Sequence, residues 1–363
     1  MKRIDRKSLK PGMVLAEDVY VNTQKVVLLN KGDVINRKDL AKIAFYSIDE
    51  VLVEDKTIPV ADDDSTTSLS GNITRSERIK ASAEFQEFKK DFEECSVALE
   101  HAINDIILKN KEFQLDELMN PIYSLIEKGG STNEIFDMLH NLRQYDDATY
   151  AHCINVALIS NILAKWLKMD DTEVAIATQA GLFHDIGKIM IPDNIIKKRG
   201  KLTAKEYEEI KKHPQIGYDA LNKQSVNIHV KNAALMHHER CDGSGYPQGL
   251  KAPQIDRYAK LVSIVDVYDA ITSARYYREP LCPFIAIELF EEDGFTKYDS
   301  EMIITFLKHI VETYITSTVQ LNSGEIGEII FINQDSLSKP TVKIGDDYID
   351  LSKCPNVFIE KIL

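Results

Sequence analysis

Three groups of polar residues in this sequence have the types and spacings from which a metal site could be built. The first is the dipeptide His184-Asp185, and the second is the pair His237-His238. The third is Asp266, an acid inside the apolar run LVSIVDVYDAI. Imidazoles and carboxylates are ligands that divalent transition metals accept in proteins. Bound cations would supply local positive charge, which would allow an acidic protein to bind a small anion.

The helices predicted around these residues decide whether they can meet. Residues 151–167 and 173–187 each read as a strong helix, and the second ends at His184-Asp185. Gly187 follows closely, which favours an irregular turn there. Buried ionisable groups need a partner or a metal, and ligands on separate helices can meet in the core of a bundle. Each group by itself gives only weak support for a metal site, because an acidic residue in a helix is more often exposed to solvent or caps the helix end.

Composition narrows the class of protein. The chain has 363 residues with 44% apolar and 28% charged residues, the proportions of a soluble globular protein of two or three domains. No apolar run approaches the roughly 18 residues of a membrane span. Residues 1–10 carry charge but precede no apolar segment, so we expect no signal peptide and a cytoplasmic location. The net charge of −13 argues against binding of a nucleic acid polymer.

The cysteines give no sign of a disulfide framework or of a thiolate zinc site. Five are present, an odd number, and they are widely spread without a C-x-x-C motif. We therefore expect reduced thiols, as in a cytosolic protein.

The pattern along the chain predicts a mainly α fold with β structure at both ends. Residues 1–58 are expected to form a β-rich regulatory module, and residues 59–73 a linker. Residues 74–130 are expected to form a helical connector, residues 131–318 the helical catalytic domain, and residues 319–363 a β extension.

Residues 74–109 are expected to form one continuous helix with a narrow apolar stripe. The stripe has alternating spacings of three and four: Phe85, Phe88, Phe92, Cys95, Leu99, Ala102 and Ile106. Two interpretations remain open. The stripe could pack on its own domain, or it could form a homodimer through this helix.

The polar groups also form part of a longer pattern. In order and spacing, His152, His184-Asp185, His213-Pro214, His237-His238 and Asp266 resemble the HD-domain metal phosphohydrolases. Residues 237–250, HHERCDGSGYPQGL, are similar to the signature of the HD-GYP subfamily, which are bacterial cyclic di-GMP phosphodiesterases. The resemblance runs from about residue 146 to residue 306 and implies an HD-domain helical bundle.

The resemblance implies two metal ions, with iron or manganese the family's usual choice. One ion would be held by His152, His184, Asp185 and Asp266, and the other by Asp185, His213, His237 and His238. Asp185 would be shared, because the two oxygens of a carboxylate can bridge two cations. Some members of the family use a glutamate four residues before the first histidine to hold a third ion. Here that position is Ala148, which has no donor atom.

The resemblance also implies residues that contact the substrate: Lys188, Tyr246, Arg275 and Arg278. Lys188 would contact the phosphate and act with Asp185 in catalysis, although it could equally be a solvated lysine after a helix end. The loop that presents Tyr246 could be a mere connector. Two departures from the family pattern, Tyr276 in place of proline and Lys260 in place of arginine, put specificity in doubt more than activity. His101, His140, His229 and His309 lie outside the pattern and are expected to be structural or exposed.

Three functions follow as alternatives. The first is hydrolysis of cyclic di-GMP to linear pGpG or GMP by a hydroxide that bridges the two metals. The second is a related phosphohydrolase that acts on another cyclic dinucleotide or on a nucleotide; the G-Y-P loop speaks against a simple nucleotidase. The third is a receptor that binds cyclic di-GMP without hydrolysis and signals through the N-terminal module. All seven expected ligands are present, which favours an enzyme.

Overall fold

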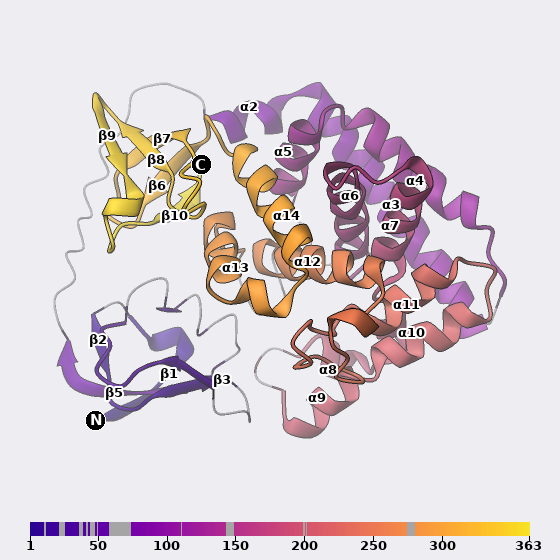
Figure 1. The fold of residues 1–363 in the computed structure, drawn as a ribbon, viewed down its shortest axis with the longest axis horizontal. Coiled ribbons are helices and arrows are strands. Elements are labelled where there is room, and N and C mark those ends of the chain that lie inside the picture. Colours follow the sequence, from indigo (N-terminus) through magenta and orange to yellow (C-terminus); the bar gives the residue numbers. More distant parts are fainter. Residues whose placement is uncertain are drawn as a thin grey trace.

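The computed structural model describes residues 1–10, 12–21, 26–35, 39–40, 43, 48, 50–57, 74–109, 111–142, 149–198, 200, 202–273 and 280–363. Along the chain, a helical region separates a small β-sheet module near the N-terminus from another near the C-terminus (Figure 1). The predicted fold class is therefore confirmed. None of the described helices is long and apolar enough to cross a membrane.

The N-terminal module has a hydrophobic core of its own. Strands β1 (Lys2–Asp5), β5 (Glu50–Thr57) and β2 (Met13–Leu15) form an antiparallel sheet in the order β1-β5-β2. Strands β3 (Val19–Val21) and β4 (Val26–Leu29) pair separately, and the short 3-10 helix η1 spans Arg6–Ser8. The core comprises Leu9, Leu15, Val19, Leu29, Ile35, Ile43, Val51 and Val53. The linker expected at residues 59–73 lies outside the described residues.

The helix expected over residues 74–109 is broken, so that prediction is wrong at one residue. Helix α2 (Arg75–Ala81) ends at Ser82, whose backbone is extended (φ −72°, ψ 148°). Helix α3 (Ala83–Lys109) then begins. The Ser82 hydroxyl accepts a hydrogen bond from the backbone N–H of Phe85 at 3.1 Å. Serine favours such a cap because its side chain satisfies an N–H group that has no partner within the helix.

The apolar stripe of α3 packs on its own chain. Phe85, Phe88 and Phe92 are each 1–2% exposed and belong to the same core as the other helices and the C-terminal strands. Of the two interpretations left open, packing within the chain is therefore the one observed. The stripe gives no reason to expect a dimer through this face.

The remaining helices form a bundle around three buried ones: α6 (Thr149–Trp166), α7 (Asp171–Phe183) and α12 (Arg257–Thr272). Helices α6 and α12 are apolar around most of their circumference, as expected for helices covered on all sides. The others are α4 (Leu115–Lys128), α5 (Thr132–Leu142), α8 (Asp193–Ile196), α9 (Ala204–Ile210), α10 (His213–Asn222), α11 (Ile228–Met236), α13 (Pro283–Lys297) and α14 (Ser300–Glu312), with 3-10 helices η3 (Ile186–Met190) and η4 (Ala252–Gln254).

The C-terminal residues form a five-stranded antiparallel sheet in the order β10-β6-β7-β8-β9 (Figure 1). Its strands are β6 (Thr318–Leu321), β7 (Ile326–Phe331), β8 (Thr341–Ile344), β9 (Asp347–Asp350) and β10 (Ile359–Ile362), and the 3-10 helix η5 spans Leu351–Lys353. Val319, Ile329 and Val342 are fully buried and join the core of the helical body. This sheet is thus packed against the helices.

Candidate metal centre

Asp185 lies at the centre of the candidate site, on an irregular step between two helices. Helix α7 ends at Phe183 and η3 begins at Ile186, so His184 and Asp185 belong to neither. Both side chains point inward, and the two residues are 0% and 2% exposed. The predicted helix end is therefore confirmed, and it allows two adjacent residues to face one site.

The glycine after this step permits a close approach of two backbones. A Cβ atom on Gly187 would lie 2.1 Å from the carbonyl oxygen of His213 and 2.6 Å from the backbone nitrogen of Gly217. Any side chain at this position would push η3 away from α10. Gly187 is thus what brings His213 within reach of Asp185.

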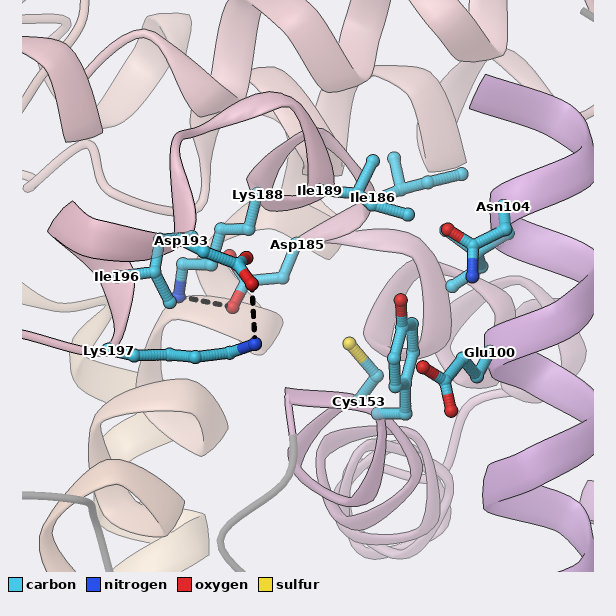
Figure 2. A pocket seen from close by; sticks show the side chains of 12 residues that line it. Glu100, Asn104, Cys153, Asp185, Ile186, Lys188, Ile189, Asp193, Ile196 and Lys197 are labelled. Atoms are coloured by element: carbon cyan, nitrogen blue, oxygen red, sulfur yellow. Dashed lines mark hydrogen bonds and ion pairs between the residues drawn. The ribbon is translucent and has the colours of Figure 1, made fainter. Parts of the chain in front are cut away.

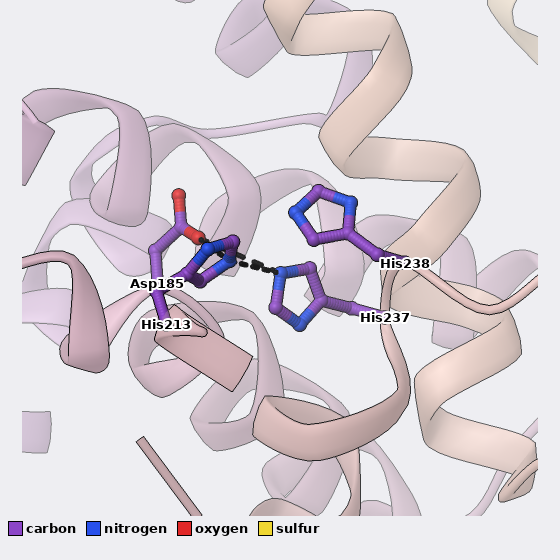
Figure 3. A group of neighbouring side chains, drawn as sticks. All are labelled: Asp185, His213, His237 and His238. Carbon is purple, nitrogen blue, oxygen red and sulfur yellow. Dashed lines mark hydrogen bonds and ion pairs between the residues drawn. The ribbon is translucent and has the colours of Figure 1, made fainter. Parts of the chain in front are cut away.

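The seven expected ligands meet in two groups. Asp185, His213, His237 and His238 form one, and His152, His184 and Asp266 form the other; within each, one ligand atom per residue lies within 4.8 Å of the others. Figure 3 shows the first group, with Asp185 and the three histidines facing a common point.

The two oxygens of Asp185 face different groups. Its Oδ1 lies 3.3 Å from Nε2 of His213 and 3.5 Å from Nε2 of His237. Its Oδ2 lies 3.3 Å from Nε2 of His184 and 3.6 Å from Nε2 of His152. One carboxylate therefore joins the two groups, which is the geometry that a shared ligand requires.

Backbone carbonyls fix the orientation of three of the histidine rings. Nδ1 of His184 lies 2.7 Å from the carbonyl oxygen of Gly181, and Nδ1 of His213 lies 2.7 Å from that of Ile210. Nδ1 of His237 lies 3.1 Å from the carbonyl oxygens of two residues in α11. Because a carbonyl only accepts, Nδ1 carries a proton in each ring, so Nε2 is the nitrogen that faces the site and can bind a metal ion once it has no proton of its own.

Burial and charge set the protonation of the cluster. Burial lowers the pKa of His237 to about 4. It would also lower that of His184, but the carboxylates of Asp185 and Asp266 raise the pKa of His184 to about 10. Burial raises the pKa of Asp185 itself, yet the charges of His184 and Lys188 outweigh this and hold it well below its usual range. Without a metal ion, the protonated His184 and the ammonium group of Lys188 balance the ionised carboxylates of the cluster, and a bound cation could take the place of the His184 proton.

The residues present fit a metal ion. Nε2 of His184 and Oδ1 of Asp185 are buried, yet neither forms a hydrogen bond with any described residue. A buried polar atom without a partner is costly, and both atoms are ordinary metal ligands. The set contains nitrogen and oxygen donors without a thiolate, which suits iron, manganese or zinc.

The sequence matches the family described as "HD domain" over residues 133–302. The match covers 170 of the 363 residues. The HD domain is metal-dependent, in agreement with the His/Asp cluster. The resemblance drawn from the residues alone is therefore confirmed.

Several characterised relatives are similar to the chain. A cyclic di-GMP phosphodiesterase of Pseudomonas aeruginosa is 38% identical over 57% of this chain and 50% of its own length. One of Thermotoga maritima is 35% identical over 60% of this chain and 59% of its own. A 3′3′-cGAMP-specific phosphodiesterase of Vibrio cholerae is 33% identical over 48% of this chain and 34% of its own. The chain thus spans about half the length of the first two relatives.

The expected substrate residues of the HD domain are described only in part. Lys188 donates a short hydrogen bond to Oδ2 of Asp185 and is partly exposed at the edge of the cluster (Figure 2). The Tyr246 ring stacks on the His238 ring with centroids 4.6 Å apart. Arg275 and Arg278 lie outside the described residues, as does Ala148.

Sequence reasoning missed two carboxylates that support the site. Asp269 accepts a hydrogen bond from Nδ1 of His152 at 2.7 Å. Its signal was its spacing of three from Asp266, which places both on one side of α12. Glu239, 2% exposed, accepts from the backbone N–H groups of Gln248 at 2.7 Å and Leu250 at 2.9 Å. It thereby holds the loop 242–250 that carries Tyr246.

A pocket of about 350 Å³ opens beside Asp185 and Lys188. Its walls come from α3, α6, η3 and α8, as Figure 2 shows in part. The lining residues are Glu100, Ile103, Asn104, Tyr150, Cys153, Asp185, Ile186, Lys188, Ile189, Asp193, Ile196 and Lys197. The presence of α3 at the site was not predicted, because nothing in its sequence pattern indicated a chemical role.

Proposed function

We propose that this protein is a metal-dependent cyclic di-GMP phosphodiesterase that hydrolyses its substrate to linear pGpG or GMP. The observation that carries the proposal is the shared carboxylate of Asp185, whose two oxygens face two groups of buried ligands. The relatives named as cyclic di-GMP phosphodiesterases support the choice of substrate.

We propose two metal ions, iron or manganese, held as the resemblance implies. His152, His184, Asp185 and Asp266 would hold one, and Asp185, His213, His237 and His238 the other. When bound, such a pair of cations neutralises the phosphodiester, activates water and stabilises the leaving oxygen. The expectation of two ions depends on Ala148 and stays a prediction.

The chain's own residues would bind and orient the substrate. Lys188 would hold a phosphate oxygen, because its ammonium group is partly exposed beside Asp185 and faces the pocket. Tyr246 would contact the substrate from the loop that Glu239 holds against His238. Arg275 and Arg278 would supply further positive charge for the phosphates. We expect Arg275→Ala to weaken substrate binding without loss of metal.

The proposal extends to the organisation of the chain. Residues 1–58 would be the regulatory module, followed by the linker 59–73, the helical connector 74–130, the HD-GYP catalytic domain 131–318 and the β extension 319–363. The separate core of the N-terminal module supports the first boundary. The connector shares its core with the catalytic domain, so we expect them to fold as one unit. The cytoplasmic location also stays a prediction.

A second candidate is hydrolysis of another cyclic dinucleotide. The similarity to a 3′3′-cGAMP-specific phosphodiesterase favours it over a simple nucleotidase. The two candidates share the metal centre and differ in the bases that the protein must recognise.

The test is an assay of the purified protein with ferrous or manganous ions under reducing conditions. Cyclic di-GMP, 3′3′-cGAMP, cyclic di-AMP and mononucleotides are incubated separately, and products are separated by chromatography. We expect cyclic di-GMP to be hydrolysed. Asp185→Ala should lose hydrolysis and most bound metal, whereas Asp219→Ala, an exposed acid on α10, should lose neither.

Two outcomes would contradict the proposal. Full metal content with unchanged turnover in Asp185→Ala would refute the role of the shared carboxylate. Tight binding of cyclic di-GMP by the metal-loaded protein without any product would instead identify a receptor.

A further inference from the structure

The pocket beside the metal centre has two chemically different ends. Asp185 and Lys188 lie at one end, where a phosphate would be held. Glu100 and Asn104 approach from α3 on the opposite wall (Figure 2). The two residues are four positions apart in a helix and therefore lie on the same face. A ligand that fills the pocket would thus meet lysine–aspartate ion pairs at one end and the carboxylate of Glu100 at the other.

Glu100 differs from the other carboxylates in the pocket. Asp185 is paired with Lys188, and Asp193 with Lys197 at 2.7 Å. Glu100 forms no ion pair with any residue in the part of the chain that the structure describes. Its carboxylate, on an exposed residue, is therefore available to accept hydrogen bonds from a ligand.

Apolar groups also line the pocket, namely Ile103, Ile189, Ile196 and the ring of Tyr150. Its volume of about 350 Å³ is at the lower end of the roughly 300–1,000 Å³ common for ligand pockets. Such a space suits one nucleoside rather than a whole cyclic dinucleotide. Proteins read an unstacked base by apolar or aromatic contact with its faces and hydrogen bonds to its Watson–Crick edge.

We infer that Glu100 recognises a guanine base of the substrate. This inference rests on the proposed function and identifies the guanine base as the part of the substrate that α3 contacts. Guanine presents two adjacent donors, N1–H and the N2 amino group, which match the two oxygens of a carboxylate. Adenine presents one amino donor beside the N1 lone pair, and that lone pair repels a carboxylate. Glu100 therefore selects guanine over adenine at this position.

Glu100 can contact only one base of a cyclic dinucleotide, so a single guanine in the ligand is enough for this interaction. Cyclic di-GMP and 3′3′-cGAMP can each place a guanine against Glu100, whereas cyclic di-AMP cannot. Binding of the first two should therefore exceed binding of the third.

The test is equilibrium titration of the metal-loaded protein with phosphorothioate analogues of the three cyclic dinucleotides, which resist hydrolysis. The wild-type protein should bind the two guanine-containing analogues at least about tenfold more tightly than the adenine analogue. Glu100→Gln should weaken the binding of those two by about 10- to 100-fold, because a hydrogen bond to a charged group is lost. Binding of the cyclic di-AMP analogue should not weaken and should tighten, because the amide removes the repulsion, can donate to N1 of adenine and can accept from its amino group.

Glu93→Gln is the matched control. Glu93 is an exposed glutamate two turns earlier on α3 and does not line the pocket. This variant should bind all three analogues as the wild-type protein does. Glu100 is exposed, so its substitution should leave the melting temperature unchanged, which a thermal melt verifies.

The outcomes separate this inference from the proposed function. Equal binding of guanine and adenine analogues by the wild-type protein, or a preference that survives in Glu100→Gln, overturns the inference even if cyclic dinucleotides are hydrolysed. Guanine preference that Glu100→Gln abolishes supports the inference even if no cyclic dinucleotide is hydrolysed, in which case the proposed function fails.

Discussion

Asp269 accepts a hydrogen bond from Nδ1 of His152 at 2.7 Å, across the interface between α12 and α6. The same ring directs Nε2 toward Asp266, 3.1 Å away. Asp266 and Asp269 thus act on opposite sides of one imidazole, one inside the ligand group and the other behind it. Ser273 donates to the second oxygen of Asp269 at 3.0 Å and fixes its orientation. A carboxylate behind a histidine ligand orients the ring and raises its basicity.

We predict that Asp269→Asn weakens metal binding by about 10- to 100-fold without removing a ligand. The neutral amide holds the His152 ring less firmly and makes it a poorer donor. Metal affinity measured by chelator competition tests this. Asp219→Asn, a change of the same type on the surface of α10, should have no effect. Equal metal affinities in the wild-type and Asp269→Asn proteins would show that Asp269 contributes only to the fold and not to metal binding.

Metal affinity should rise with pH. Burial disfavours a charged His184, but Asp185 and Asp266 raise its pKa to about 10, so without a cation the ring keeps its proton at neutral pH. A metal ion needs the lone pair that this proton occupies, and its binding must release the proton. Below pH 10 the apparent affinity should therefore increase by about tenfold per pH unit for each proton released.

Proton release can be measured directly. Addition of manganous ion to the weakly buffered protein at pH 7 should acidify the solution. Asp185→Ala, expected to bind little metal, is the blank. An affinity that stays constant between pH 6 and pH 9, with no acidification, would rule out a protonated His184 in the metal-free protein.

We expect Gly187→Ala to destabilise the protein by about 1–3 kcal/mol or more and to reduce metal binding. The new methyl group would collide with the backbone of α10 at 2.1 Å and push His213 away from Asp185. Thermal unfolding and metal content measure the two effects. Gly294→Ala is the matched control, because a Cβ there meets only side-chain atoms at 3.5 Å or more. A normal melting temperature together with full metal content in Gly187→Ala would disprove the steric argument.

Phe88→Ala should lower stability rather than change the oligomeric state. Phe88 is 1% exposed within the core of its own chain, and loss of a buried phenylalanine costs about 3–5 kcal/mol. Val97→Ala, 53% exposed on the same helix, should cost little. Denaturant unfolding and sedimentation are measured together. A folded variant of unchanged stability but half the wild-type mass would mean that α3 forms a dimer after all.

Much of the local structure followed from sequence patterns. Thr203 and Glu206, three residues apart, form a capping box at the start of α9, and the β extension expected from residue 319 begins with the hairpin of β6 and β7. Such features depend on neighbours a few residues apart, so their causes lie within the segment itself. The break at Ser82 was not predicted. The sequence on both sides of Ser82 has a helical pattern, and this pattern does not reveal that Ser82 caps the start of a second helix.

The sequence by itself determined which residues can bind metal at the site. Histidine and aspartate at these spacings have a fixed ligand chemistry, and all seven expected ligands do meet. Only the tertiary structure decided that each oxygen of Asp185 faces a different group, that Asp269 stands behind His152, and that α3 brings Glu100 to the same pocket as Asp185. Helical periodicity shows that one face of α3 must be covered, but not by what. The covering surface is made of residues distant in the chain, so long-range packing alone selects it and leaves Glu100 on the face that lines the pocket.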